Sequence, residues 1–249
     1  MNLKRKIGSL LLAMIPAGIV FSAACAEQKI PVSAQVENTV TTPTPPAKPS
    51  NNTNQTPLNK AATKPVVSRP AIVSRQEWKA KAAVGEVKQH TLRFITIHHT
   101  ATLQKKAVDI AKKMQGLQNF SQNEGRLDSG KIKPAWFDVP YHFYIAADGT
   151  IAEGRELKFI GDTNTDYDPT GHALIVLEGN FETEQPSAEQ QKSLRELATW
   201  LAVQYKIPAD EIKAHNDYAS TACPGKNLKQ WLPELREKVG EIIRTAQKP

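Results

Sequence analysis

The chain has 249 residues, of which 40% are hydrophobic and 23% are charged, and its formal net charge is +7. This composition is typical of a globular protein and excludes a wholly disordered chain. The basic residues are not interleaved with aromatic residues, so nothing in the pattern indicates nucleic-acid binding. The composition is uneven along the chain, which indicates separate segments.

Residues 1–26 have the pattern of a secretory signal peptide. Basic residues at positions 4–6 precede an apolar run from Ile7 to about Phe21, and small residues close the segment. The run is short and is interrupted by proline and glycine, which disfavours a retained membrane helix. We therefore expect export to the periplasm or the medium. Loss of the segment, which holds three basic and no acidic residues, lowers the net charge from +7 to +4. A mildly basic domain suits an anionic wall or membrane surface.

Two schemes of signal processing fit the residues around Cys25. Ala24-Cys25-Ala26 has the small-x-small form that precedes ordinary cleavage after Ala26. The alternative is cleavage before Cys25 and lipidation of its thiol, which would anchor the protein in the outer membrane as a lipoprotein. Ser22 stands where a lipobox usually has leucine, so the residues favour ordinary cleavage.

Either scheme leaves Cys223 as the only free thiol of the processed chain. No intrachain disulfide can then form, and a lone thiol is a liability in an oxidising compartment. A bound metal ion would occupy and shield the thiolate. The cysteine count therefore favours a metal ligand at Cys223.

Residues 27–70 form a second segment, rich in proline, threonine, asparagine, serine and alanine. Because this segment has few aromatic side chains or long apolar runs, it cannot bury enough surface to fold, and we expect a disordered, partly extended linker. The remaining residues, 71–249, number about 180, which is enough for one domain with a substantial core. We expect this domain to be monomeric.

Three strand patterns are predicted in the folded domain. Arg93–His98 is the first, and Tyr141–Ala146 turns at Asp148-Gly149 into Thr150–Glu153, which is a hairpin signal. Ala173–Leu177 is a nearly continuous apolar run, which indicates a central strand buried on both faces of its sheet.

Three helices are predicted as well. One covers about Ala107–Asn119, and another begins after Ser187 and runs to about Tyr205. Ser187 and Gln190 have the spacing of a capping box. The third covers about Pro233–Thr245. Strands interleaved with helices predict an α/β fold, with a central mixed β-sheet flanked by helices in a single domain.

Six histidines occur in the chain, and they are not equally good candidates for metal ligands. His98 ends the first predicted strand beside His99. Adjacent strand residues face opposite sides, so only one of the two enters a given site in a regular strand, and the residues alone leave open which. We expect His142 in the core and His90 at the solvent-exposed surface.

His215 and Cys223 flank a loop rich in Asn, Asp and Ser, and such a loop can bring both of its ends to one ion. Together with His98 they form a His-His-Cys set. Catalytic zinc sites commonly use three protein ligands and keep a fourth position open for water. A zinc ion lowers the pKa of a water molecule bound at that position, so the water supplies hydroxide near neutral pH.

The sequence resembles the type-2 N-acetylmuramoyl-L-alanine amidases, which share a fold with the peptidoglycan recognition proteins and certain phage lysozymes. The matching segments follow the order of that family and span most of residues 71–249. They are IVSRQEW at 72–78, IHHTA at 97–101, VPYHFYI at 139–145, DGTIAEGR at 148–155, LEGNF at 177–181 and HNDYASTACPG at 215–225.

The resemblance implies a role for each matching position. It implies that His98, His215 and Cys223 bind zinc, and that His99 does not. Tyr141 would position or deprotonate the attacking water, and Thr221 would hydrogen-bond the developing oxyanion or the substrate carbonyl. The implied activity is zinc-dependent hydrolysis of the amide between N-acetylmuramic acid and L-alanine in peptidoglycan or muropeptides.

The alternative function is a module that binds peptidoglycan without cutting it. Members of this fold that only bind generally lack the thiolate ligand, so Cys223 favours the enzyme. The sequence also departs from the relatives that recycle wall fragments, because Val176 stands where they carry a catalytic glutamate. The resemblance therefore implies a tyrosine-based site.

Overall fold

The computed structural model describes residues 67–127 and 130–247. The predicted signal peptide at 1–26 and nearly all of the predicted linker at 27–70 lie outside these residues. Among the residues described, no helix combines the length and the apolar character needed to cross a membrane.

A five-stranded mixed sheet forms the centre of the folded part, in the order β5-β4-β6-β1-β7. Its strands are β1 (Phe94–His99), β4 (Phe143–Ile145), β5 (Ile151–Glu153), β6 (His172–Leu177) and β7 (Ile212–Ala214). The pairs β4·β6, β6·β1 and β1·β7 are parallel, and β4 and β5 form the predicted antiparallel hairpin. A separate two-stranded sheet pairs β2 (Gly125–Arg126) with β3 (Ile132–Lys133).

Strand β6 lies in the middle of the sheet, and all six of its residues are buried. This confirms the prediction from its apolar run. Alternate residues face two separate parts of the core: Ile175 packs in a cluster with the C-terminal helices, and Val176 packs in a second cluster on the opposite face. A strand covered on both faces exposes neither face to water, so its residues can be apolar throughout and need not alternate with polar ones.

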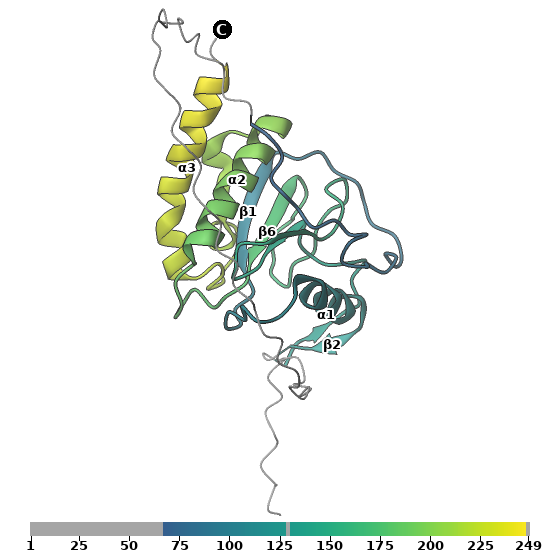
Figure 1. Cartoon of the computed structure of the whole chain (residues 1–249). Helices are drawn as coiled ribbons and strands as arrows, with labels where there is room; N and C mark the ends of the chain where they lie inside the picture. The colour runs from purple at the N-terminus through teal and green to yellow at the C-terminus, as the bar shows by residue number, and fades with distance from the viewer. Residues whose placement is uncertain (1–66, 128–129, 248–249) are drawn as a thin grey trace, which may run out of the picture. The chain divides into compact units, whose positions relative to one another are not determined.

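Helices α2 (Ala188–Tyr205) and α3 (Lys226–Gln247) cover one face of the sheet, and α1 (Ile110–Gln122) lies on the other side of β1 and β6 (Figure 1). The apolar stripe of α2, including Leu194, Leu197 and Leu201, is fully buried against β1, β4 and β6. Ser187 and Gln190 form the predicted capping box at the start of α2. The predicted α/β fold is therefore confirmed.

The start of the last helix and three short strands differ from prediction. Helix α3 begins at Lys226 rather than near Pro233, which lies inside it. An interior proline costs about 3 kcal/mol, but Leu228 and Leu232 before it are fully buried in the core and offset that cost. Strands β2, β3 and β7 were not predicted, because two or three residues carry no readable alternation.

The prediction of a solvent-exposed His90 is wrong. The ring is half-buried: its Nε2 bonds the Leu157 carbonyl at 3.0 Å, and its Nδ1 accepts the Gly171 amide at 2.8 Å. Both partners come from distant parts of the chain, so the polar local sequence concealed the contact.

Candidate metal centre

Parallel pairing brings the two central histidines together. Ile97 of β1 packs in the core beneath α2 and α3, so the next residue, His98, faces the opposite side of the sheet. Ile97 pairs in register with Ala214 of β7, and His215 follows directly at the start of the 3-10 helix η2 (His215–Asp217). Because both strands run the same way, His98 and His215 meet at one edge, and their ring centroids are 4.4 Å apart.

Local hydrogen bonds fold the following loop back onto the histidines. The Asp217 carboxylate accepts the Ala214 amide at 2.8 Å, as expected for a turn-forming aspartate. The Asn216 amide donates to the Cys223 carbonyl at 3.0 Å, which closes the loop. The loop therefore returns the thiol to the position where the chain left β7.

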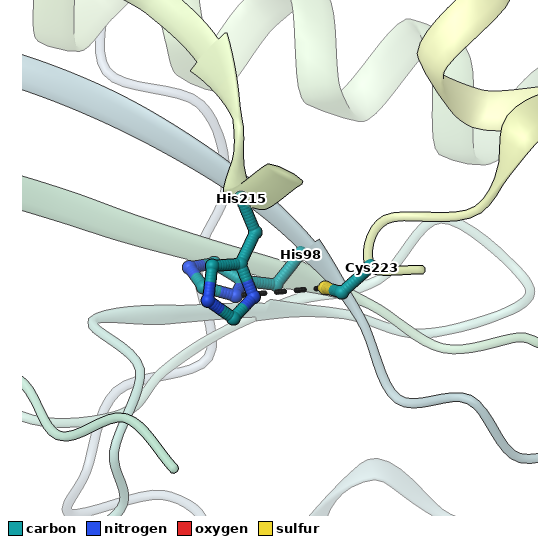
Figure 2. Close-up of side chains that lie close together, drawn as sticks. All are labelled: His98, His215 and Cys223. Carbon is teal, nitrogen blue, oxygen red and sulfur yellow. Dashed lines mark hydrogen bonds between the residues drawn. The ribbon is translucent and has the colours of Figure 1, made fainter. Parts of the chain in front are cut away.

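The side chains of His98, His215 and Cys223 converge, and one ligand atom from each lies within 4.8 Å of the others (Figure 2). His98 Nδ1 is 3.7 Å from Cys223 Sγ. His99 faces away: its Nδ1 accepts the Phe181 amide at 3.3 Å, and only its backbone N–H reaches Sγ, at 3.4 Å. The structure thus brings together the predicted set and leaves His99 out of it.

The donor set fits a divalent metal ion. His215 Nδ1 is buried and has no hydrogen-bond partner in the described part of the chain, which is uncommon for a buried polar atom, and His98 Nδ1 faces Cys223 Sγ. Two imidazoles and one thiol are ligands that suit zinc. Three protein ligands would leave the fourth coordination position for water or substrate.

Burial sets the protonation of this cluster. It is the main cause that lowers the pKa of His98 well below its usual value, with neighbouring His215 adding to the effect. Burial likewise lowers the pKa of His215 to about 4. Both imidazoles are therefore neutral near pH 7 and have a lone pair to offer. Burial also raises the pKa of Cys223 to about 12, so the thiolate requires a cation beside it.

Tyr141 and Thr221 border the cluster. The Tyr141 ring centroid lies 5.2 Å from that of His98, and burial, followed by Cys223, raises the pKa of the phenol. The phenol is therefore protonated at neutral pH. The Thr221 hydroxyl oxygen accepts the Cys223 amide at 3.2 Å, so its own proton remains available to another acceptor.

The structure offers no free carboxylate at the position of the relatives' catalytic glutamate, Val176, or at nearby Glu178. Val176 is fully buried and pairs in register with His98. The Glu178 carboxylate is buried, pairs with Lys113 at 2.7 Å and accepts the Ala147 amide at 2.9 Å. Glu178 therefore joins α1 to the end of β6.

Sequence reasoning missed the segment 162–171 between β5 and β6, which packs beside His215. Thr165 Oγ1 is 2.7 Å from His215 Nε2, and the Tyr167 ring centroid is 5.2 Å from that of His215. The Tyr167 hydroxyl is buried and has no partner among the described residues. A polar stretch with aspartate and proline predicts a turn, and nothing in it signals a neighbour fifty residues ahead.

Fold and side chains together define a class: an α/β domain with a candidate metal centre of two imidazoles and one thiol at the ends of neighbouring parallel strands. The chain belongs to the N-acetylmuramoyl-L-alanine amidase family, because the model of that family matches residues 88–226, more than half of its length. It belongs to an enzyme class that hydrolyses the amide bond of peptidoglycan.

Similar proteins include enzymes and recognition proteins. The endolysin of Klebsiella phage KP32 is 30% identical over 154 residues, which cover 60% of this chain and 91% of the endolysin. The solved endolysine N-acetylmuramoyl-L-alanine amidase LysCS of Clostridium intestinale URNW has a TM-score of 0.54 and 25% identity, covering 70% of this chain and 98% of that one. A Drosophila PGRP-LB mutant solved in complex with tracheal cytotoxin has a TM-score of 0.53 and 28% identity, covering 64% and 90%.

Proposed function

We propose that this chain cleaves the amide between N-acetylmuramic acid and L-alanine with a zinc ion held by His98, His215 and Cys223. The observation that carries the proposal is the convergence of these three side chains, with His215 Nδ1 buried and without another partner among the described residues. The thiol supports hydrolysis over simple binding, because a thiolate offsets much of the charge of the ion and completes a three-ligand site.

A zinc ion supplies Lewis-acid chemistry: it polarises a carbonyl and makes water nucleophilic near neutral pH. The protein has to orient the reactants. Tyr141, whose ring lies against that of His98, holds the attacking water by its phenol. Thr221 donates its hydroxyl proton to the scissile carbonyl oxygen, since the oxygen of that hydroxyl is already engaged by the Cys223 amide. The water oxygen bonds to the carbonyl carbon, the C–N bond breaks, and a water proton passes to the amine of L-alanine.

The substrate is peptidoglycan or muropeptides, in accord with the tracheal cytotoxin complex of the structural neighbour. The place of action is outside the cytoplasm, where that polymer lies. The remaining parts of the proposal rest on the sequence pattern alone. We propose that the segment 1–26 directs export, with ordinary cleavage rather than lipidation of Cys25. The linker 27–70 extends the reach of the domain, and the domain is a monomer.

The test measures metal content and reaction products on the full chain. Wild type should hold about one zinc per molecule and release peptides with a free L-alanine amine from purified peptidoglycan, as seen by mass spectrometry, and a chelator should abolish release. Cys223→Ala should lose both the zinc and the release. The control is His90→Gln, a histidine outside the cluster, which should keep both.

Two results would contradict the proposal. Full activity of the chelator-treated, metal-free protein would remove zinc from the reaction. Zinc-loaded wild type that binds peptidoglycan but releases no peptide would establish the binding module instead.

A further inference from the structure

The two histidines of the candidate centre differ in what holds the far side of their rings. His215 Nε2 is 2.7 Å from the hydroxyl of Thr165, in the segment between β5 and β6. His98 Nε2 has no such partner within the described residues. An outer partner of this kind fixes both the tautomer and the ring orientation of a metal-binding histidine.

The direction of the Thr165 hydrogen bond to His215 is coupled to the contact that Thr165 makes with Thr163. The Thr165 backbone N–H donates to Thr163 Oγ1 at 3.1 Å, and the two hydroxyl oxygens are 2.7 Å apart. Either hydroxyl of this pair can donate to the other; when Thr165 donates, its proton goes to the second lone pair of Thr163 Oγ1. Thr165 Oγ1 is then left as an acceptor, and His215 Nε2–H is the donor that it faces.

The other side of the His215 ring supports the same direction. His215 Nδ1 is buried and has no partner among the described residues. If Thr165 donated instead, the imidazole proton would sit on Nδ1 as a buried N–H without an acceptor, which is the rarer and costlier orphan. With the proton on Nε2, the group without a partner is a lone pair directed to the cluster with Cys223.

Aromatic packing holds the ring in this orientation. The Tyr167 ring is tilted by 55° against that of His215, at 5.2 Å, and is itself stacked on Tyr218 at 5.6 Å. The segment that supplies the hydrogen bond therefore also supplies a wall for the imidazole, so rotation of the ring away from Thr165 is opposed from the side.

We propose that Thr165 is a positioning residue of the metal centre: it accepts the proton of His215 Nε2 and so presents Nδ1 to the ion, with Thr163 orienting the Thr165 hydroxyl. The inference rests on the zinc site proposed above, and it adds a residue pair that acts on the ion through His215.

The first test is on the metal-free full chain. Two-bond nitrogen–proton correlation spectra of labelled imidazoles at about pH 7.5 report which nitrogen carries the proton. Wild-type His215 should be in the Nε2–H form. A wild-type His215 in the Nδ1–H form overturns the inference without recourse to any variant, and does so whether or not the protein binds zinc.

The second test compares matched variants by zinc competition against a chromophoric chelator. Thr165→Val keeps the shape of the side chain and removes the acceptor, so His215 should lose its tautomer preference and the zinc Kd should rise about 10- to 100-fold. Thr165→Ser keeps the hydroxyl and should restore both. Thermal unfolding of each metal-free variant identifies any that has lost its fold.

Unchanged tautomer and Kd in folded Thr165→Val would refute the role of Thr165. That result differs from failure of the proposed function, which is measured on wild type by its zinc content and its release of peptide.

Discussion

His142, just before β4, is a buried histidine outside the metal centre, and its surroundings make stability depend on pH. Its Nδ1 accepts the Leu174 amide at 2.9 Å, and its Nε2 donates to the Phe159 carbonyl at 2.9 Å. A second proton on Nδ1 would face the Leu174 N–H donor. Burial is the main cause that lowers the pKa of His142 from 6.5 to about 3. The ring is therefore neutral in the folded protein throughout the mildly acidic range.

The sign of the effect follows from proton counting. The unfolded chain takes up a proton at this residue near its ordinary pKa of 6.5, whereas the folded chain does so only near 3. Stability from this group is thus complete above pH 6.5 and is lost as the pH falls toward 3. The loss approaches about 1.4 kcal/mol per pH unit, or about 2 kcal/mol between pH 6.5 and about pH 4.5.

The assay is urea unfolding from about pH 7.5 to about pH 4.5, with chelator present so that loss of metal at acid pH does not contribute. His142→Gln provides the comparison, because it keeps a donor for Phe159 and does not titrate. The variant should be less stable at neutral pH by about 1–3 kcal/mol, since the Leu174 amide loses its acceptor. It should also show a shallower pH dependence, with the difference from wild type shrinking by about 2 kcal/mol toward pH 4.5. Parallel pH curves for the two proteins would refute the assignment of a neutral, proton-excluding His142.

Two further predictions concern catalysis and the buried ion pair. Tyr141→Phe should keep its zinc and lose about 100-fold in kcat/KM, because the phenol that orients the water is gone; a rate equal to wild type would remove Tyr141 from the mechanism. Lys113→Met should destabilise the protein by about 3–5 kcal/mol in urea unfolding, because it leaves the Glu178 carboxylate buried without its cation. Exposed Lys112→Met is its control, and equal effects of the two substitutions would mean that the ion pair contributes nothing.

Local patterns predicted the parts of the fold in which neighbouring residues carry the signal. The apolar run at β6 marks a strand covered on both faces, and Ser187 with Gln190 marks the start of α2. The start of α3 was wrong because Pro233 reads locally as a first helical residue, whereas the burial of Leu228 and Leu232 extends the helix before it.

The candidate centre was likewise predictable only where local patterns carry the signal. The motifs around His98, His215 and Cys223 are readable because each carries its own local pattern, and the resemblance joins them. The contact from Thr165 to His215 depends on how two loops meet across the folded sheet, and no local pattern encodes it. Such contacts, made only after the strands have paired, are what the sequence does not display.

The position of His215 after the edge strand has a consequence for the durability of the enzyme. Strand β7 has three residues and pairs only with β1 in the described sheet, and Cys223 is the one cysteine in the described part of the chain, so no disulfide fastens that edge. An ion held by His98, His215 and Cys223 would link β1, the end of β7 and the loop beyond it. The free energy of metal binding would then add to the stability of the fold. Molecules that lose the ion would open first at this edge, so proteases outside the cytoplasm would remove inactive copies before active ones.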